Sequence, residues 1–254
     1  MTATVLRVEQ LSAAYQKNIV LRNVNFQVQA GSLTGIVGPN GAGKSTLIKT
    51  LLNIHPALSG TVTFFGSPLK KVKKRIGYVP QRSSVDWDFP ASALDVVMMG
   101  LYGKIGWLKR PKKQHRELAF KALKKVGMAH YAGRQIRQLS GGQQQRVFLA
   151  RALVQEADLY FMDEPLAGVD ARTERAIMDI LDELKKQGKT VMVVHHDLQT
   201  VTDYFDHVLF LNRTVITHGK TEDVFTEENI RKTYGGSLRL KGVTGDHVFR
   251  LVKQ

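Results

Sequence analysis

At 254 residues and 43% hydrophobic content, the chain is long enough to bury one sizeable core, so one compact unit is expected. It contains no cysteine, which excludes disulfides and thiolate metal sites, and its longest apolar runs are strand-sized, whereas a membrane-spanning helix needs about 20 apolar residues. The net charge of +15 favours nucleic acid, anionic lipid headgroups or an acidic partner without choosing among them.

The amino-terminal residues have no basic start followed by an apolar core and a cleavage site, so no secretion signal is expected and the predicted location is the cytoplasm. Short β-branched runs at residues 6–8, 24–28 and 61–65 have turns and no helices between them, which predicts a small antiparallel β layer. The runs at 33–37, 159–162, 190–194 and 208–211 alternate with helical patterns. That alternation predicts an α/β fold with a mostly parallel core sheet.

Residues 38–45 read Gly-Pro-Asn-Gly-Ala-Gly-Lys-Ser and match the phosphate-binding loop pattern at every fixed position. They follow the apolar run at 33–37 and open a helix near Lys44, which is the context the motif requires. Glycines let backbone N–H groups curl round phosphates, and the helix N-terminus adds partial positive charge. Lys44 is expected to reach the β- and γ-phosphates, and Ser45 to ligate Mg²⁺. The predicted nucleotide-binding residues here are Gly38, Pro39, Asn40, Gly41, Ala42, Gly43, Lys44, Ser45 and Thr46.

Two basic clusters, at residues 70–75 and 109–113, hold much of the excess positive charge. Such clusters are typical of a solvated surface beside loops. Contact with an anionic membrane surface is the alternative, because each basic residue near such a surface contributes about 1 kcal/mol. The sequence leaves both interpretations open.

Helical spacing replaces the strand signal after residue 92, which predicts an inserted helical lobe over 92–155. Within it, Ser140, Gly141, Gly142 and Gln143 open an amphipathic run. These residues predict a second helix N-terminus with exposed N–H groups, and therefore a second anion site. One triphosphate cannot lie at both helix ends if they are far apart in one subunit.

The apolar run at 159–162 delivers Asp163 and Glu164 at its carboxyl end, where ligands bind in open α/β sheets. One carboxylate can hold the magnesium and its water shell while its neighbour polarises the attacking water. We assign Asp163 to the metal and Glu164 to the water. Alone, such a pair is more often a cap or an ion-pair partner, so the assignment depends on the phosphate loop.

The strand-sized run at 190–194 is followed by His195, His196 and Asp197. Such a cluster is also compatible with a metal site. Adjacent residues on a strand point to opposite faces, however, so the two imidazoles cannot easily bind one ion. Upstream, Asp170 is expected to cap a helix over 171–186.

The run Leu-Ser-Gly-Gly-Gln at 139–143 resembles the signature motif of the ATP-binding cassette (ABC) ATPase family, and the resemblance extends from about residue 6 to 235. It implies a P-loop NTPase fold whose core is 1–91 and 156–235, with 236–254 as a C-terminal tail. In that family the signature of one subunit completes the ATP site of the other. The resemblance therefore implies a head-to-tail homodimer around two ATP molecules.

Other residues take roles that only the resemblance implies. Tyr15 would stack on adenine, although an isolated tyrosine in this context would be an ordinary half-buried one. Gln81 would contact Mg²⁺ and the attacking water, while its loop senses a membrane subunit. Asp170, in Ala-Gly-Val-Asp where many members have Ser-Ala-Leu-Asp, would communicate between subunits, and His196 would touch the γ-phosphate.

Asp-Trp-Asp-Phe-Pro at 86–90 resembles the corresponding run in bacterial importers of manganese, zinc and iron. This likeness implies an ATPase that powers uptake of a divalent metal ion, with manganese first. Its partners would be an integral membrane permease and, indirectly, an extracytoplasmic metal-binding protein, and it would be peripheral on the cytoplasmic face of the plasma membrane. The alternatives are an importer of another substrate such as an iron chelate, an exporter's ATPase, a non-transport ABC ATPase acting on nucleic acid, and a non-enzymatic binding module. No nucleic acid is expected as a partner.

Overall fold

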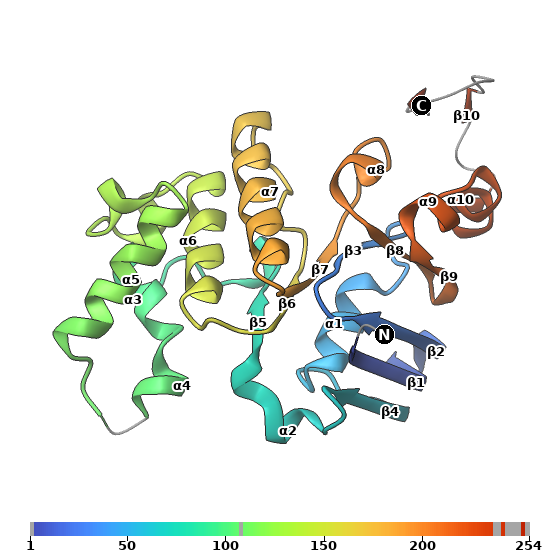
Figure 1. The fold of residues 1–254 in the computed structure, drawn as a ribbon, viewed down its shortest axis with the longest axis horizontal. Coiled ribbons are helices and arrows are strands. Elements are labelled where there is room, and N and C mark those ends of the chain that lie inside the picture. The colour runs from blue at the N-terminus through green and yellow to red at the C-terminus, as the bar shows by residue number, and fades with distance from the viewer. Residues whose placement is uncertain (1–2, 107–108, 236–239, 242–249, 252–254) are drawn as a thin grey trace. The chain divides into compact units, whose positions relative to one another are not determined.

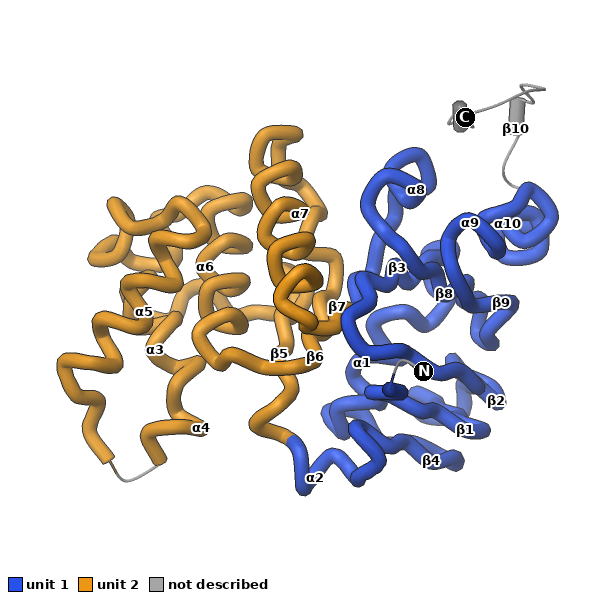
Figure 2. Tube along the Cα trace, in the orientation of Figure 1, with its two compact units in different colours: residues 1–72, 192–254 blue, residues 73–191 orange. Residues whose placement is uncertain are grey.

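The computed structural model describes residues 3–106, 109–235, 240–241 and 250–251. The chain divides into two compact units, coloured separately in Figure 2. Unit 1 comprises residues 1–72 and 192–254, and unit 2 comprises residues 73–191. The boundaries of the core, the helical lobe and the tail stay a prediction, and most of the tail, 236–254, lies outside the described residues.

An antiparallel sheet in unit 1 has the strand order β2-β1-β4 (Figure 1). Its strands are β1 (Thr4–Tyr15), β2 (Asn18–Gln29) and β4 (Ser59–Phe64). In the register Leu6 pairs with Val28 on one side and with Phe64 on the other, and all three side chains are buried. Alternation of buried and exposed positions along β1 and β2 shows that one face of this sheet packs on the core.

Parallel pairing in unit 1 joins β3 (Leu33–Val37) to β8 (His207–Asn212), and β9 (Thr214–Lys220) continues from β8 as an antiparallel hairpin. All five residues of β3 are buried, as expected for a strand covered on both faces. The helices of unit 1 are α1 (Lys44–Leu51), α2 (Leu69–Val72), α8 (Val201–Tyr204), α9 (Thr221–Val224) and α10 (Glu227–Tyr234). The short antiparallel pair β10 (Leu240–Lys241) and β11 (Arg250–Leu251) follows them.

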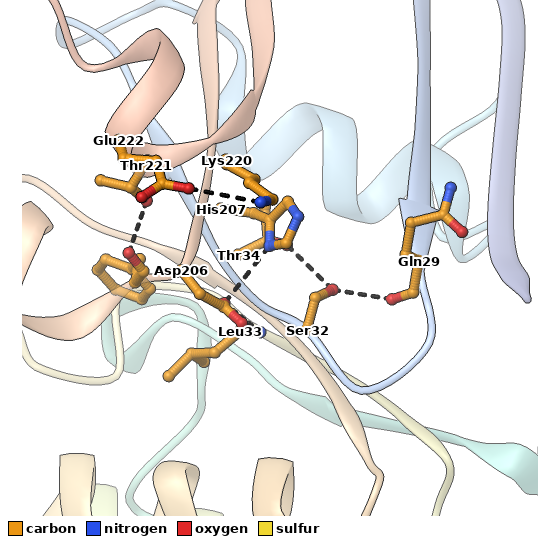
Figure 3. A network of polar contacts seen from close by, with 10 residues as sticks. Gln29, Ser32, Leu33, Thr34, Asp206, His207, Lys220, Thr221 and Glu222 are labelled. Atoms are coloured by element: carbon orange, nitrogen blue, oxygen red, sulfur yellow. Dashed lines mark hydrogen bonds and ion pairs between the residues drawn. The ribbon is translucent and has the colours of Figure 1, made fainter. Parts of the chain in front are cut away.

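A polar network holds the amino ends of β3 and β8 (Figure 3). The Leu33 N–H donates to Asp206 Oδ1 over 2.7 Å, and the Thr221 hydroxyl donates to the carbonyl of Phe205 over 2.6 Å. Ser32 Oγ in turn donates to the carbonyl oxygen of Gln29 over 2.8 Å. This network lies where the two parallel strands begin. Their carboxyl ends, where ligands bind in open α/β sheets, lie at the opposite ends of the strands.

Unit 2 combines a parallel strand pair with helices. Strand β5 (Ile76–Val79) pairs with β6 (Leu159–Met162). Helices α3 (Ala93–Met99), α5 (Lys113–Lys125) and α6 (Gly141–Leu153) pack on one another, with Val97, Leu123 and Val147 buried. The remaining helices are α4 (Tyr102–Ile105) and α7 (Ala171–Lys186), with 3₁₀ turns at Lys73–Arg75, Arg82–Ser84, Ala129–Tyr131 and Ile136–Gln138. Strand β7 (Thr190–Val194) contains the boundary between the units.

The predicted α/β class, with parallel strands, a small antiparallel sheet and helices, is confirmed. Strands β3, β6 and β7 have the predicted bounds, and α7 spans the predicted residues behind its Asp170 cap. Within residues 3–106 and 109–235, no helix has the length and apolar character that a membrane span requires.

Candidate nucleotide-binding site

The phosphate loop of unit 1 connects β3 to α1. Gly41 and Gly43 adopt positive φ angles of 78° and 95°, a conformation that side chains other than glycine rarely adopt. A Cβ atom on Gly43 would lie 2.7 Å from Leu21 Cδ2, whereas one on Gly41 would meet nothing within 4 Å. The loop is therefore packed on one side and open at Gly41.

Lys44 is only 5% exposed, and its ammonium group stays within the loop. Nζ donates to the carbonyl oxygens of Gly38 over 2.6 Å and of Pro39 over 2.9 Å. These bonds hold a positive charge inside the ring of backbone formed by the loop. Such a charge among backbone N–H groups suits a polyphosphate.

Tyr15 ends β1 and exposes 46% of its surface. Its ring centroid lies 4.2 Å from that of His55, and the imidazole Nε2 of His55 contacts the carbonyl oxygen of Ala14 at 3.0 Å. The His55 ring therefore packs against one side of the Tyr15 ring. No motif in the sequence points to His55, because the contact depends on the fold alone.

The two histidines that follow β7 have different environments. The His195 N–H donates to the carbonyl oxygen of Ile36 in β3 over 3.0 Å. His195 is 4% exposed, its Nε2 lies 2.7 Å from the Thr200 hydroxyl, and burial lowers its pKa to about 4. His196 is exposed. The alternation predicted from strand geometry therefore directs only His196 outward.

In unit 2, the carboxylate pair follows β6 as predicted. Asp163 is fully buried and donates its N–H to the carbonyl of Val79 over 2.9 Å. Burial first, and then the charge of Asp163, raises the pKa of Tyr78 to about 12. Glu164 is half-buried and has a φ of 54°. This left-handed backbone conformation interrupts the extended chain directly after β6.

The Glu164 side chain faces a cavity of about 400 Å³ in unit 2. The cavity is lined by Gln81, Arg82, Ser83, Trp87, Glu164, Ala167 and Gly168. The structure thus brings together Glu164, the loop that contains Gln81 and the segment that precedes Asp170. The sequence had connected them only through a family resemblance.

The signature residues begin α6. Ser140 is the N-cap and accepts from the Gln143 N–H, while the Gln143 side chain accepts from the Ser140 N–H, which forms a capping box. A Cβ atom on Gly141 would lie 3.1 Å from Arg82 Cζ, and one on Gly142 would lie 3.5 Å from Val169 Cγ1. The signature turn therefore packs between the Gln81 loop and the Asp170 loop.

Arg82 and Asp170 fix the two loops beside this turn. Arg82 Nε donates to Gln144 Oε1 over 3.0 Å, a contact that the sequence does not indicate. Asp170 caps α7 by accepting from the Thr173 N–H and hydroxyl, and these bonds lower the pKa of its carboxyl group. Both loops are thus tied to helices.

The predicted site residues are divided between the units. The phosphate loop, Tyr15 and His196 belong to unit 1, whereas Gln81, the signature residues, Asp163, Glu164 and Asp170 belong to unit 2. A separate cavity of about 530 Å³ lies over the polar network of Figure 3 and is lined by Ser32, Thr34, His207 and His218 among others. It lies at the amino ends of β3 and β8, and no predicted site residue within the described part of unit 1 lines it.

Comparison with known proteins decides the family. The family model described as ABC transporter matches residues 21–167. The chain belongs to the ABC transporter family. The resemblance based on its signature motif is therefore confirmed, and the chain is an ATPase whose hydrolysis is coupled to transport.

Relatives with curated names cover almost the whole ABC chain. The manganese transport system ATP-binding protein MntB of Bacillus subtilis (strain 168) is 64% identical over 233 residues, which is 92% of this chain and 93% of the relative. The zinc transport system ATP-binding protein TroB of Treponema pallidum (strain Nichols) is 54% identical over 93% of this chain and 89% of the relative.

Solved ABC structures share the fold. An inward-facing ABC transporter described as of the metal-chelate type superposes with a TM-score of 0.84 at 28% identity, over 99% of this chain and 98% of the other. A dimeric post-hydrolysis ATP-binding cassette with ADP and phosphate superposes with a TM-score of 0.76 at 28% identity, over 85% and 98%. Nucleotide binding is thus a property of the ABC fold that this chain shares.

Proposed function

We propose that the chain is the ATP-hydrolysing subunit of an importer for a divalent metal ion, with manganese as the first candidate and zinc or iron as alternatives. The observation that supports this most is the 64% identity to a manganese system protein over 92% of the chain. The 54% identity to a zinc system protein keeps the ion open among first-row divalent metals. The ion itself is cargo of the membrane partner and is not bound by the ATPase.

We propose that the phosphate loop holds ATP through its backbone N–H groups and Lys44. The positive φ angles of Gly41 and Gly43 and the enclosed Lys44 ammonium fit a polyphosphate. Mg²⁺ would be held by the hydroxyl of Ser45, the carboxylate of Asp163 and the side-chain oxygen of Gln81. Oxygen ligands of this kind are the ones that Mg²⁺ prefers. When bound, the ion would neutralise charge that develops on the phosphates.

Glu164 is proposed to accept the proton of the attacking water, with Gln81 orienting that water. Both side chains line the same cavity and both are half-buried, which suits groups that must meet water and substrate. His196 is proposed to contact the γ-phosphate and Tyr15 the adenine ring. The exposure of both side chains supports these roles.

The signature turn is proposed to complete the ATP site of a second copy of this chain in a head-to-tail dimer. Ser140, Gly141 and Gly142 begin α6, a helix of 13 residues, so its N-terminal dipole favours an anion. Asp170 on the adjacent loop would communicate across the dimer. The dimeric cassette among the structural relatives supports this arrangement.

The membrane permease is proposed to dock in an aromatic groove of unit 2. A cavity of about 290 Å³ is lined there by Asp86, Trp87, Phe89, Val96, Met99, Ile136, Phe148 and Arg151. Phe89 is 52% exposed, and the Trp87 and Phe148 rings lie 5.0 Å apart. Such a groove accepts apolar side chains from a partner segment. The proposed location is therefore peripheral, on the cytoplasmic face of the plasma membrane.

The cargo can be tested by competition. Cells that contain the transporter would be supplied with a trace of labelled manganese, and uptake would be measured against increasing unlabelled manganese, zinc, iron(II) or an iron chelate. We expect manganese to compete at the lowest concentration. Stronger competition by the iron chelate would replace the proposed cargo and leave the ATPase assignment unchanged.

A further inference from the structure

A histidine outside every motif lies against the tyrosine that is proposed to contact adenine. The ring centroids of His55 and Tyr15 are 4.2 Å apart, and the two ring planes are tilted by 30° from parallel. Close packing of two aromatic rings is favourable beyond the area that it buries. Tyr15 still exposes 46% of its surface, so part of its side chain stays open to a ligand.

Hydrogen bonds fix the position of His55 in unit 1. Its imidazole Nε2 lies 3.0 Å from the carbonyl oxygen of Ala14, the residue before Tyr15, and because a carbonyl oxygen can only accept, Nε2 is the donor. The backbone N–H of His55 donates to the carbonyl oxygen of Lys49 over 3.1 Å, and the N–H of Ile54 donates to the same oxygen over 2.8 Å. His55 is therefore held both to the end of β1 and to the last turn of α1.

Helix α1 connects this histidine to the phosphate loop. The helix begins at Lys44, whose ammonium group is bonded within the loop, and ends at Leu51, shortly before His55. Leu47, Leu51 and most other residues of α1 are buried, and a packed helix holds a site more precisely than a free loop does. One helix of unit 1 therefore carries the phosphate end of the proposed site and anchors the side chain that supports Tyr15.

We propose that His55 is a positioning residue that orients the Tyr15 ring for stacking on the adenine of ATP. The inference rests on the proposed nucleotide site, and in particular on the adenine role of Tyr15. His55 covers one side of the Tyr15 ring and touches no reacting atom. Its contribution is preorganisation, because an aromatic ring that is already held in one orientation loses less conformational entropy when its ligand binds.

The test compares His55→Ala with His55→Phe in the full-length chain, and repeats His55→Ala in a chain that also contains Tyr15→Ala. Phenylalanine keeps a ring beside Tyr15 and loses the bond to Ala14. Equilibrium binding would be measured with magnesium present for ATP and for inorganic tripolyphosphate, which has no adenine, together with KM, kcat and the melting temperature. Ile54→Ala is the matched control, since Ile54 precedes His55 and is 58% exposed.

His55→Ala is expected to raise the Kd and KM for ATP about two- to tenfold, the effect of losing one aromatic pair, with kcat close to the wild-type value. The Kd for tripolyphosphate is expected to stay unchanged, because His55 acts only through the adenine end of the site. His55→Phe is expected to lie between the wild type and His55→Ala. In the Tyr15→Ala chain, His55→Ala is expected to have no further effect on the Kd for ATP, and Ile54→Ala is expected to change neither Kd.

An unchanged Kd for ATP in His55→Ala would overturn the inference, and so would a lower Kd, which would show that the His55 ring occupies the place of adenine. Equal increases for ATP and for tripolyphosphate would also overturn it, since these would show a general disturbance of unit 1. If Tyr15→Ala alone left the Kd for ATP unchanged, the adenine role of Tyr15 would fail and this inference with it. That result differs from one in which Tyr15→Ala weakens binding and His55→Ala does not, where only the inference fails.

Discussion

Trp87 donates its indole N–H to the backbone carbonyl of Arg82 over 2.9 Å. The same ring lines both the aromatic groove and the cavity that contains Glu164. One side chain of unit 2 therefore connects the proposed permease surface to the loop that carries Gln81.

Trp87→Ala is expected to separate hydrolysis from transport. Removal of a central aromatic anchor typically weakens an interface by about 2 kcal/mol or more, so metal uptake should fall by an order of magnitude. Basal hydrolysis by the isolated chain should fall much less than uptake, because the ring lines the cavity of Glu164 but is not proposed to touch ATP. Parallel measurement of uptake and ATPase activity checks this. Equal losses in both would contradict a coupling role.

Glu164→Gln is expected to bind ATP and to hydrolyse it about 100-fold more slowly or worse, because general base catalysis contributes at least that much. The amide keeps the size of the side chain and removes its basicity. Phosphate release and nucleotide affinity would be measured on the same preparation, with Glu174→Gln on α7 as a half-buried carboxylate control. Normal turnover in Glu164→Gln would remove Glu164 from its proposed role.

Gly38→Ala tests the close approach of β8 to the phosphate loop. The new methyl carbon would lie 2.0 Å from the Leu211 carbonyl oxygen, so the loop must shift. Overpacking of this kind costs about 1–3 kcal/mol, and both melting temperature and ATP affinity should fall. Gly133→Ala is the control, since a Cβ atom there meets nothing within 4 Å. A neutral effect of Gly38→Ala would show that the loop is more tolerant than its packing indicates.

His195 is expected to make the fold sensitive to acid. Burial lowers its pKa in the folded chain to about 4, from 6.5, so between those pH values the unfolded chain binds a proton that the folded chain does not. Stability should therefore decrease as pH falls from about 6.5 to 4, by at most about 3 kcal/mol from this group.

Denaturant unfolding at pH 7 and pH 5 would measure this loss of stability in the wild type, in His195→Gln and in His130→Gln. Glutamine keeps a partner for Thr200 and does not titrate, so His195→Gln should lose less stability on acidification than the wild type. The exposed His130 serves as the control. Identical pH dependence in all three chains would be inconsistent with a buried neutral His195.

Short buried strands were predictable from sequence because their ends are marked chemically. Strand β3 is followed by the glycine loop, and β6 by two carboxylates. In both cases the apolar run ends where the strand ends. Strands β1 and β2 are much longer than the predicted runs at 6–8 and 24–28. Their alternation is interrupted at Gln10 and Asn23, which have positive φ angles of 51° and 47° beside irregularities in the register.

Motif residues were likewise predictable because spacing along one chain defines them, although their roles stay predictions. Contacts made by the fold were not. His55 packs against Tyr15, and Arg82 bonds to Gln144, each across many residues of sequence. Neither His55 nor Arg82 belongs to a motif, so only the arrangement of strands and helices shows that they adjoin the predicted site.

The central claim is that ATP hydrolysis by this chain powers metal import. The most direct measurement is the cellular content of manganese, zinc and iron in cells that lack the chain, with the wild type or Glu164→Gln restored. We predict that manganese falls and that only the wild type restores it. Unchanged contents of all three metals, or rescue by Glu164→Gln, would contradict the claim.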